Sequence, residues 1–335
     1  MISNAQSRGA VPVPGFTDCR IIGQDAFFSV RWQDWCAVEC GGLPKPSDLP
    51  RGWDLAGGKF LSQARMSAVP LPTPERSHGV ARLGFRRVGA WTKLEGLRQQ
   101  GSAKAFVHPG ERGPDVVFLN TSGGMTGGDR LEYALTLGAG CRVTATTQTA
   151  ERAYLSDAGV ARVEVAHEVG AGGHLDWLPQ ETILFEGSAL DRTTVVSLGA
   201  GASCLVLEAV VLGRLALGEV VRRLQFRDTR RVLRGGVPVL MEPLRLSDAA
   251  LVAGLGVLGG SRAFASLALV AEGAEARVAA VRAVLDEPGV NAGASGFDGK
   301  LTVRLMSADG WPMRRQILRV LEVLRDGPLP RVWQM

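Results

Sequence analysis

The chain has 335 residues, of which 46% are hydrophobic and 21% charged, the balance of a soluble globular protein with one large or two ordinary domains. The net charge is only +5, and no Lys/Arg block with interleaved aromatics occurs, so nucleic-acid binding has no support. The longest weakly polar run, residues 249–260, is too short and glycine-rich to span a bilayer. Without a signal-peptide pattern, and with five scattered cysteines, we expect a cytoplasmic protein with free thiols.

Residues 1–74 differ from the rest of the chain. They hold eight of the 17 prolines and show no sustained period of 2 or 3.6. We therefore predict a poorly ordered extension over 1–74, in which Cys36 and Cys40 are ordinary thiols, and a β domain over 75–335. An alternative is that the native product begins at Met66.

From about residue 81 to residue 246 the pattern is almost wholly that of β-strands, with apolar residues alternating between turn signals. The predicted strands are 80–88, 103–107, 115–119, 131–137, 141–148, 160–168, 174–178, 181–185, 192–198, 203–212, 219–226 and 237–246. Helical spacing occurs only later, over 274–285 and 312–324, with a further strand predicted at 300–306 between them.

Three Gly-Ala-Gly corners, at 138–140, 170–172 and 199–201, each end one strand and open another. Their spacing of about 30 residues indicates stacked β units. The alternative is that Gly-Ala-Gly is simply a convenient tight turn. The predicted fold is mainly β, with a two-sheet or solenoid-like stacked β architecture and about two C-terminal helices.

The stretch 118–129, FLNTSGGMTGGD, joins two predicted strands through two glycine pairs, which allow positive φ and close backbone approach. A phosphate-binding loop would need a Lys near the position of Asp129 and a helix after it. Asp129 and a following strand exclude a nucleotide-binding loop here. The bend is therefore predicted to present Asp129 at its rim.

Catalytic patterns are weak. No G-x-S-x-G elbow occurs, and the histidines have no obvious nucleophile beside them. His167 and His174 flank the second corner, where a tight hairpin would place them opposite each other as a metal site; exposed strand histidines are the alternative.

Acidic residues at strand ends and inside strands are more informative. Glu208 lies within an apolar strand, where an unpaired carboxylate would be costly, so we expect it to have a partner or to face a wet interior. Arg214 and Glu219 flank a short turn and are expected to pair.

Four ordered segments carry a resemblance: SGGMTGGDRL (122–131), TTQTAERAY (146–154), LDWLPQETILFEGSAL (175–190) and LEAVVLGRLALGE (207–219). They resemble the urease accessory protein family UreD, also called UreH, and weaker similarity extends over residues 75–335. The sequence departs from the family pattern at Ser122, usually Pro, and at Leu155, usually a basic residue.

The resemblance implies a protein that is not an enzyme. Similar proteins bind the accessory subunits UreF and UreG, the latter a GTPase, dock on apo-urease and help to deliver nickel to its active site. No tightly bound cofactor is implied, only transient nickel. The motif residues expected to shape the fold or contact partners are Gly123, Gly124, Gly127, Gly128, Gln148, Tyr154, Pro179, Gln180, Gly213 and Arg214.

A nickel conduit must release its ion, and because Ni²⁺ binds Cys and His cages tightly, carboxylates and carbonyls suit transfer better. The candidate path residues are Asp129, Glu181, Glu186, Glu208 and Glu219, each with a surface charge or a salt bridge as its alternative. A different function, a β-rich hydrolase or carbohydrate-active enzyme using strand-end carboxylates, would need a carboxylate pair in a cleft. Glu181 and Glu186, five apart on one predicted strand, would lie on opposite faces, which disfavours that pair. A purely structural β scaffold is a third interpretation.

Overall fold

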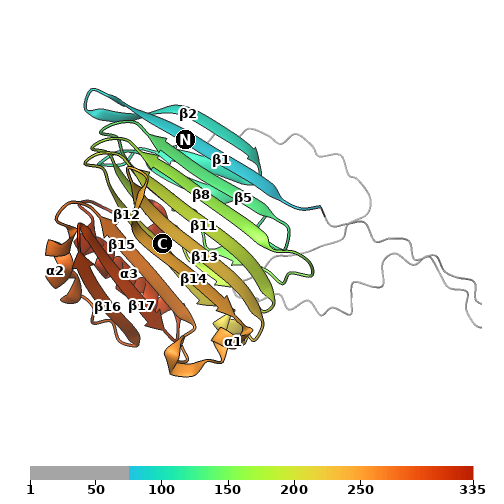
Figure 1. The fold of residues 1–335 in the computed structure, drawn as a ribbon. Helices are drawn as coiled ribbons and strands as arrows, with labels where there is room; N and C mark the ends of the chain where they lie inside the picture. The colour runs from blue at the N-terminus through green and yellow to red at the C-terminus, as the bar shows by residue number, and fades with distance from the viewer. Residues whose placement is uncertain (1–74, 335) are drawn as a thin grey trace, which may run out of the picture. The chain divides into compact units, whose positions relative to one another are not determined.

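The computed structural model describes residues 75–334, and Figure 1 shows their path. The predictions made for residues 1–74, including the proline-rich extension, the thiols of Cys36 and Cys40 and a start at Met66, lie outside the described residues.

The described residues form two β-sheets that pack face to face (Figure 1). The seven-stranded sheet contains, in spatial order, β14 (Val237–Ser247), β13 (Leu224–Arg234), β11 (Ser188–Leu198), β8 (Ala161–Val169), β5 (Arg130–Leu137), β1 (His78–Val88) and β2 (Trp91–Gly101). The ten-stranded sheet runs through β16 (Val290–Phe297), β17 (Lys300–Ser307), β15 (Ala263–Val270), β12 (Ser203–Leu212), β9 (His174–Trp177), β6 (Arg142–Thr147), β4 (Asp115–Asn120) and β3 (Ala103–His108), with β10 (Thr182–Leu184) and β7 (Glu151–Ala153) added beside β12. The fold is mainly β with two sheets, as predicted.

The chain alternates between the two sheets, passing from β5 to β6, from β8 to β9 and from β11 to β12. Each passage is one of the Gly-Ala-Gly corners, and the corners stack on one another. The backbone N–H of Gly140 donates to the Ala171 carbonyl at 2.8 Å, and that of Gly172 donates to the Ala200 carbonyl at 2.9 Å. The stacked, solenoid-like arrangement predicted from the repeat is therefore confirmed.

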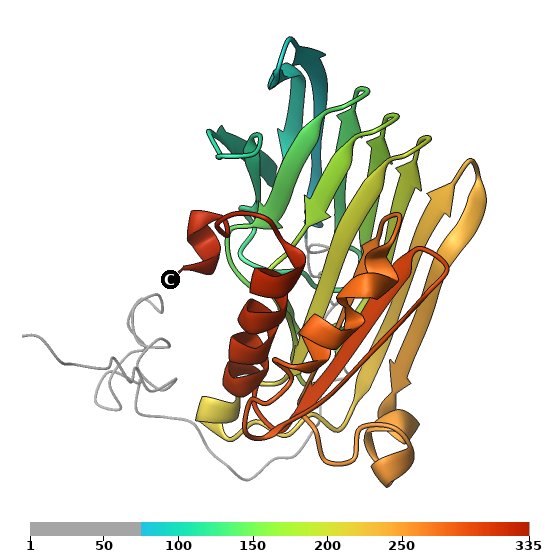
Figure 2. The ribbon, with the colours of Figure 1, turned by 90° about the vertical axis from the view of Figure 1, so that its left-hand side faces the viewer.

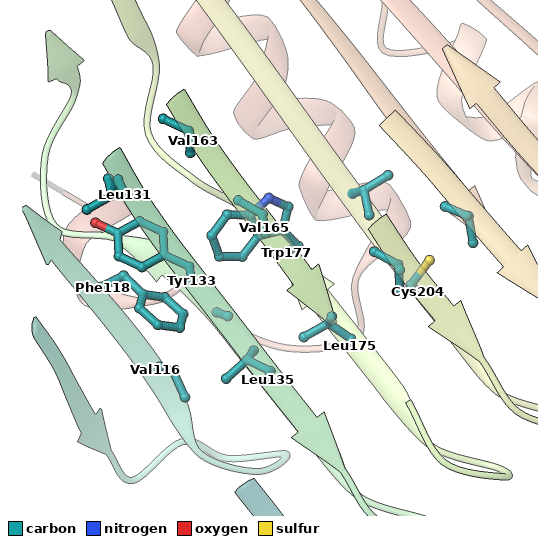
Figure 3. Packing of buried hydrophobic residues seen from close by; sticks show 14 of the residues in the cluster. Val116, Phe118, Leu131, Tyr133, Leu135, Val163, Val165, Leu175, Trp177 and Cys204 are labelled. Atoms are coloured by element: carbon teal, nitrogen blue, oxygen red, sulfur yellow. The ribbon is translucent and has the colours of Figure 1, made fainter. Parts of the chain in front are cut away.

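The ten-stranded sheet separates two hydrophobic cores, and β12 shows why. Alternate side chains of a strand point to opposite faces, so Cys204 and Val206 face the seven-stranded sheet while Leu205 and Leu207 face away from it. Figure 3 shows part of the inter-sheet core, in which Phe118 packs against Tyr133 with ring centroids 4.5 Å apart.

The second core lies between the ten-stranded sheet and helix α3 (Gly310–Leu324), the long red helix beside the red and orange strands in Figure 2. Asp309 caps α3 by accepting from the Trp311 N–H at 2.9 Å. The other helical segments are short: α1 (Asp248–Leu251), α2 (Val278–Arg282), η2 (Leu215–Leu217), η3 (Gly254–Gly256), η4 (Ala274–Arg277) and η5 (Arg331–Trp333). None of the helices described is long and apolar enough to cross a membrane.

Two predicted elements need correction. The strand predicted over 219–226 begins only at Leu224, because Gly218 adopts a left-handed conformation (φ 67°) and Glu219 folds back onto the Arg214 N–H. The helix predicted over 274–285 is limited to η4 and α2, since the Val284 carbonyl accepts from the Gln316 side chain.

Strands β2, β7, β15 and β16 were not predicted. Strand β2 is exposed on both faces, and β15 is largely buried on both, so neither shows the alternation that marks a half-buried strand. Strand β7 has only three residues, and β16 is built of small residues.

Candidate functional site

The glycine-rich bend 121–129 carries the chain from β4 in the ten-stranded sheet to β5 in the seven-stranded sheet. Glycine is required at Gly124, where φ is 149° and an added Cβ would overlap the ring of Tyr154. The bend thus places its backbone directly against the segment that follows β7.

Asp129 closes this bend. Its side chain is 5% exposed, and its two carboxylate oxygens accept from the backbone N–H groups of Ser77 and Thr126, each at 2.8 Å. The carboxylate thus joins the segment before β1, through Ser77, to the bend, through Thr126, at the start of β5. The predicted presentation of Asp129 at the rim of the bend is therefore wrong, because its carboxylate is buried and both oxygens bind backbone N–H groups.

The four motif segments meet at the end of the sandwich where this bend lies, which we call the motif end. The Tyr154 hydroxyl donates to the Gly123 carbonyl at 3.2 Å, and the Tyr154 ring packs edge-on against Phe185 at 5.1 Å. The Arg214 guanidinium lies over the Phe185 ring, 4.5 Å from its centroid, and pairs with Glu219 at 2.8 Å. The predicted pair of Arg214 and Glu219 is confirmed.

Glu186 and Glu219 order the loop before β13. The Glu186 carboxylate accepts from the N–H groups of Arg222 (2.6 Å) and Arg223 (3.1 Å), and these bonds lower its pKa. Burial opposes ionisation of Glu219, but hydrogen bonds from Arg214 and from the Glu186 N–H outweigh it and lower the Glu219 pKa. Both carboxylates are therefore ionised, and both accept hydrogen bonds from the backbone.

Gly213, the remaining glycine of the predicted motif set, has φ 68° and donates its N–H to the Leu184 carbonyl at 2.8 Å. It therefore turns the chain from β12 toward η2 while staying tied to the end of β10.

Two cavities of about 40 Å³ each lie in the inter-sheet core, and one of them reaches Gly123 at the motif end. Their walls share Tyr133, Thr147 and Glu151. One also reaches Asn120 and Gln148, whereas the other reaches Glu208. Asn120 donates to the Glu151 carboxylate at 3.2 Å, and burial raises the pKa of Glu151.

Glu208, at the inner end of these cavities, is 4% exposed. Arg192 pairs with it at 2.8 Å and with Asp228 at 2.9 Å, and the Trp177 indole N–H donates to it at 3.4 Å. Burial raises the pKa of Glu208, while Arg192 opposes that shift. The expectation that Glu208 has a partner is confirmed.

Charged residues continue from Glu208 toward the β14–β17 side of the sandwich. In the ten-stranded sheet Glu208 is paired in register with Ser266, which is paired with Arg304. From the facing sheet Glu242 contacts Arg304 and Arg230, each at 3.1 Å. We call the set Arg192, Glu208, Asp228, Arg230, Glu242, Ser266 and Arg304 the polar row.

The segment with Pro179, Gln180 and Glu181 lies between the inner cavity and a larger apolar groove of about 420 Å³ beside α3. Arg314 on α3 donates to the Gln180 side chain at 2.7 Å and pairs with Glu181 at 3.4 Å. The groove is therefore joined by polar contacts to the motif segment 175–190, and its rim carries exposed Trp311.

The two histidines of the second corner do not form a site together. His167 is 1% exposed in the inter-sheet core, where it packs on Trp177 at 4.7 Å, whereas His174 lines a pocket of about 420 Å³ elsewhere. The prediction that His167 and His174 lie opposite each other is wrong. His167 points from the seven-stranded sheet into the inter-sheet core, whereas His174 lies on the face of the ten-stranded sheet that points away from that core. Burial lowers the pKa of His167 to about 3.

His174 has a neighbour that the sequence did not suggest. Its Nδ1 lies 2.7 Å from Ser203 Oγ, and its Nε2 lies 3.0 Å from Asp176 Oδ1. Asp176 also pairs with Arg325 at 2.8 Å, with both side chains 8% exposed. This pair attaches the segment after α3 to the sheet.

The five predicted path carboxylates therefore lie in four places: Asp129 in the bend, Glu181 at the groove, Glu208 inside, and Glu186 together with Glu219 at the motif end. Sequence reasoning missed Glu151, Asn120, Arg192 and Asp228. A usable signal was present in β11, where Arg192 lies two residues from Leu190 and hence on the buried face.

No group of three or more His, Cys, Asp or Glu side chains in the described range is placed to hold a metal ion. The donors that face the cavities are carboxylate, amide and hydroxyl oxygens, which bind a divalent transition metal more loosely than thiolates or imidazoles do.

Comparison with known proteins gives a consistent result. The family model described as UreD urease accessory protein matches residues 77–334. A urease accessory protein UreD of Cereibacter sphaeroides (strain ATCC 17025) is 64% identical over 264 residues, covering 78% of this chain and 96% of the relative. Proteins with the same description from Paracoccus denitrificans and Rhizobium leguminosarum bv. trifolii are 48% and 43% identical, covering 83% and 81% of this chain and 99% and 100% of the relatives.

Proposed function

Because the chain belongs to the UreD urease accessory protein family, we propose that it is a non-catalytic subunit for urease maturation. In this proposal it joins UreF and the GTPase UreG on cytoplasmic apo-urease and passes nickel toward the active site. GTP hydrolysis falls to the partner, since the bend at 121–129 ends in Asp129 and continues as a strand.

One observation carries the metal-transfer part of the proposal. Glu151 and Glu208 face neighbouring cavities of the inter-sheet core that share three wall residues, and one of these cavities reaches Gly123 at the motif end. A bound cation favours the ionised carboxylate, whereas burial favours the protonated one. Nickel and protons would therefore exchange at these groups, so the ion is held briefly and released. Of the sequence-derived candidates, Glu208 fits this task best.

The charge requirement can be tested with Glu151→Gln/Glu208→Gln, which keeps side-chain size but removes both negative charges. We expect apo-urease activation by purified accessory proteins, nickel and GTP to slow at least tenfold, while the variant still co-elutes with its partners. Glu164→Gln, at an exposed position of β8, is the matched control. Normal activation by the double variant within an assembled complex would contradict the transfer path.

The docking part of the proposal is supported by exposed apolar side chains beside the motif end and the groove. Leu215, Leu217 and Trp311 are 47%, 70% and 60% exposed. We expect Leu217→Glu/Trp311→Glu to lose co-purification with the accessory partners. Leu255→Glu, at a 95% exposed residue on η3, should retain it. Equal retention by both variants would place the accessory partners on another surface.

The hydrolase alternative has a single specific observation in its favour, the chain of side-chain contacts from Ser203 through His174 to Asp176. Because Asp176 is shared with Arg325, we favour a structural role for this chain of contacts. A fluorophosphonate probe, which labels nucleophilic serines, tests the alternative directly, and we expect no label on Ser203. Labelling of the unsubstituted protein that disappears in Ser203→Ala would support a hydrolase.

A further inference from the structure

The outer face of the seven-stranded sheet carries a line of basic side chains. Strand register places one residue from each of six neighbouring strands side by side: His78, Arg130, Arg162, Asp191, Arg227 and Arg245. All except half-buried Asp191 are exposed. We call this set the arginine row.

The row contains unfavourable neighbours. Arg130 is directly opposite Arg162, and Arg227 is directly opposite Arg245. Like charges directly opposite each other destabilise a sheet. Within the row, only the pair of Arg227 with Asp191, at 3.6 Å, offsets this repulsion.

Carboxylates beside the row pair with none of its arginines. Glu132 lies two residues after Arg130 but pairs with Arg82 at 2.8 Å and with His78 at 3.8 Å. Glu164 lies two residues after Arg162, and no ion pair within 4.0 Å joins it to another described residue. Arginine therefore remains in excess along the line.

We propose that the arginine row is a docking surface for an extended acidic segment of a protein partner. Six strands at about 4.8 Å spacing give a line of about 24 Å, which an extended peptide of about seven residues spans. Guanidinium groups bind carboxylates through paired, charge-assisted hydrogen bonds. Occupation would relieve the Arg–Arg repulsion that the free sheet carries.

The charge pattern favours a polypeptide over a nucleic acid. Asp191 interrupts the row, and Glu132 and Glu164 flank it, so a continuous phosphate chain would meet carboxylates at several points. A peptide can place its acidic residues only where arginines lie. Residues 1–74 of this chain contain about as many basic as acidic residues and thus lack the required charge.

The location agrees with a docking role. Arg130 is the first residue of β5 and follows Asp129, so one end of the row continues directly from the motif end. The inference rests on the proposed accessory function for the nature of the partner, a protein, but does not require metal transfer.

The test uses the full chain and a fluorescent heptapeptide of Glu and Asp residues, measured by fluorescence anisotropy. We expect the peptide to bind, with affinity falling steeply as salt rises, and Arg130→Gln/Arg162→Gln to weaken binding at least tenfold. The control Arg98→Gln/Arg231→Gln removes the same charge at exposed positions outside the row and should change affinity less than twofold. The Tm of the row variant should be unchanged or higher, because the repulsive pair is lost.

Several results would overturn the inference. No peptide binding, or equal loss in the row and control variants, would remove the row as a specific surface. Tighter binding of a single-stranded oligonucleotide of equal charge would replace the peptide by a nucleic acid. The Glu151→Gln/Glu208→Gln protein should bind the peptide normally, so failure of peptide docking and failure of metal transfer are distinguishable.

Discussion

The two cores on either side of the ten-stranded sheet differ in how they treat polar groups. On the helix side, buried Gln316 is satisfied, accepting from the Glu287 N–H at 2.9 Å and donating to the Val284 carbonyl at 2.6 Å. On the inter-sheet side lie described buried polar side-chain atoms that lack a hydrogen-bond partner, in His167, Ser188, Thr194 and Arg230. The helix-side core is built for stability, whereas the inter-sheet core sacrifices some stability for polar groups.

That difference indicates where function lies. Apolar residues of similar volume often replace a buried ion pair without loss of stability. The polar row is thus not needed to hold the sheets together, and its place beside the cavities of the motif end favours a role in transfer. Substitutions on the two sides should separate these contributions.

The largest expected effect is on the inter-sheet side. Arg192→Met leaves Glu208 and Asp228 buried without their cation and should lower the free energy of unfolding by about 3–5 kcal/mol. Urea denaturation at pH 7 measures it. The triple variant Arg192→Met/Glu208→Leu/Asp228→Leu should recover most of this stability yet fail to support urease activation. A triple variant that activates urease normally would separate the polar row from function.

On the helix side, Leu321→Ala removes a fully buried side chain and should cost about 3 kcal/mol. Urease activation per folded molecule should not change, because Leu321 lies on the opposite side of the ten-stranded sheet from the cavities. The measurement pairs a urea denaturation curve with activation assays well below the unfolding temperature. A transfer defect in the folded variant would show that the two cores are coupled.

Acidification should weaken the inter-sheet core through His167. Its pKa is lowered to about 3 in the folded state from an unfolded value of 6.5, so its contribution is present above pH 6.5 and lost as pH falls toward 3. Between pH 6.5 and 5 this amounts to about 2 kcal/mol. Urea denaturation of His167→Leu over this range should show that much less pH dependence, whereas exposed His78→Gln should behave as the unsubstituted protein.

The smallest expected effect is at the surface. Glu219→Gln removes an ion pair with half-exposed Arg214, and such pairs contribute about 0.2–1 kcal/mol. Thermal unfolding should barely move, while binding of the accessory partners weakens because the loop before β13 loses its order. A large drop in Tm with intact binding would instead assign Glu219 to the scaffold.

Much of the fold follows from sequence because alternation and corners are local signals. The Gly-Ala-Gly spacing predicted stacking, and Pro312 with the apolar residues after it predicted α3. Strand β15 was missed because burial on both faces erases alternation, a consequence of helix packing that only tertiary structure reveals.

The site was less predictable, for a physical reason. Glu208 could be identified because its own strand is apolar, and its need for a partner follows from that alone. The identity of the partner, Arg192, depends on which strands face each other across the core. Glu151 was overlooked because it lies in a three-residue strand whose burial comes entirely from its neighbours.

Helix α3 follows every strand of the ten-stranded sheet in the described sequence, and this order has a consequence for synthesis. Until the last turn of this helix leaves the ribosome, Leu205, Leu207 and their neighbours on the ten-stranded sheet have no cover. The parallel strands also join residues about 30 positions apart, and such non-local pairing is slow to form. A nascent chain would therefore expose a wide apolar sheet face, so ribosome-bound holdase chaperones should associate with it until α3 has emerged and packs on that face.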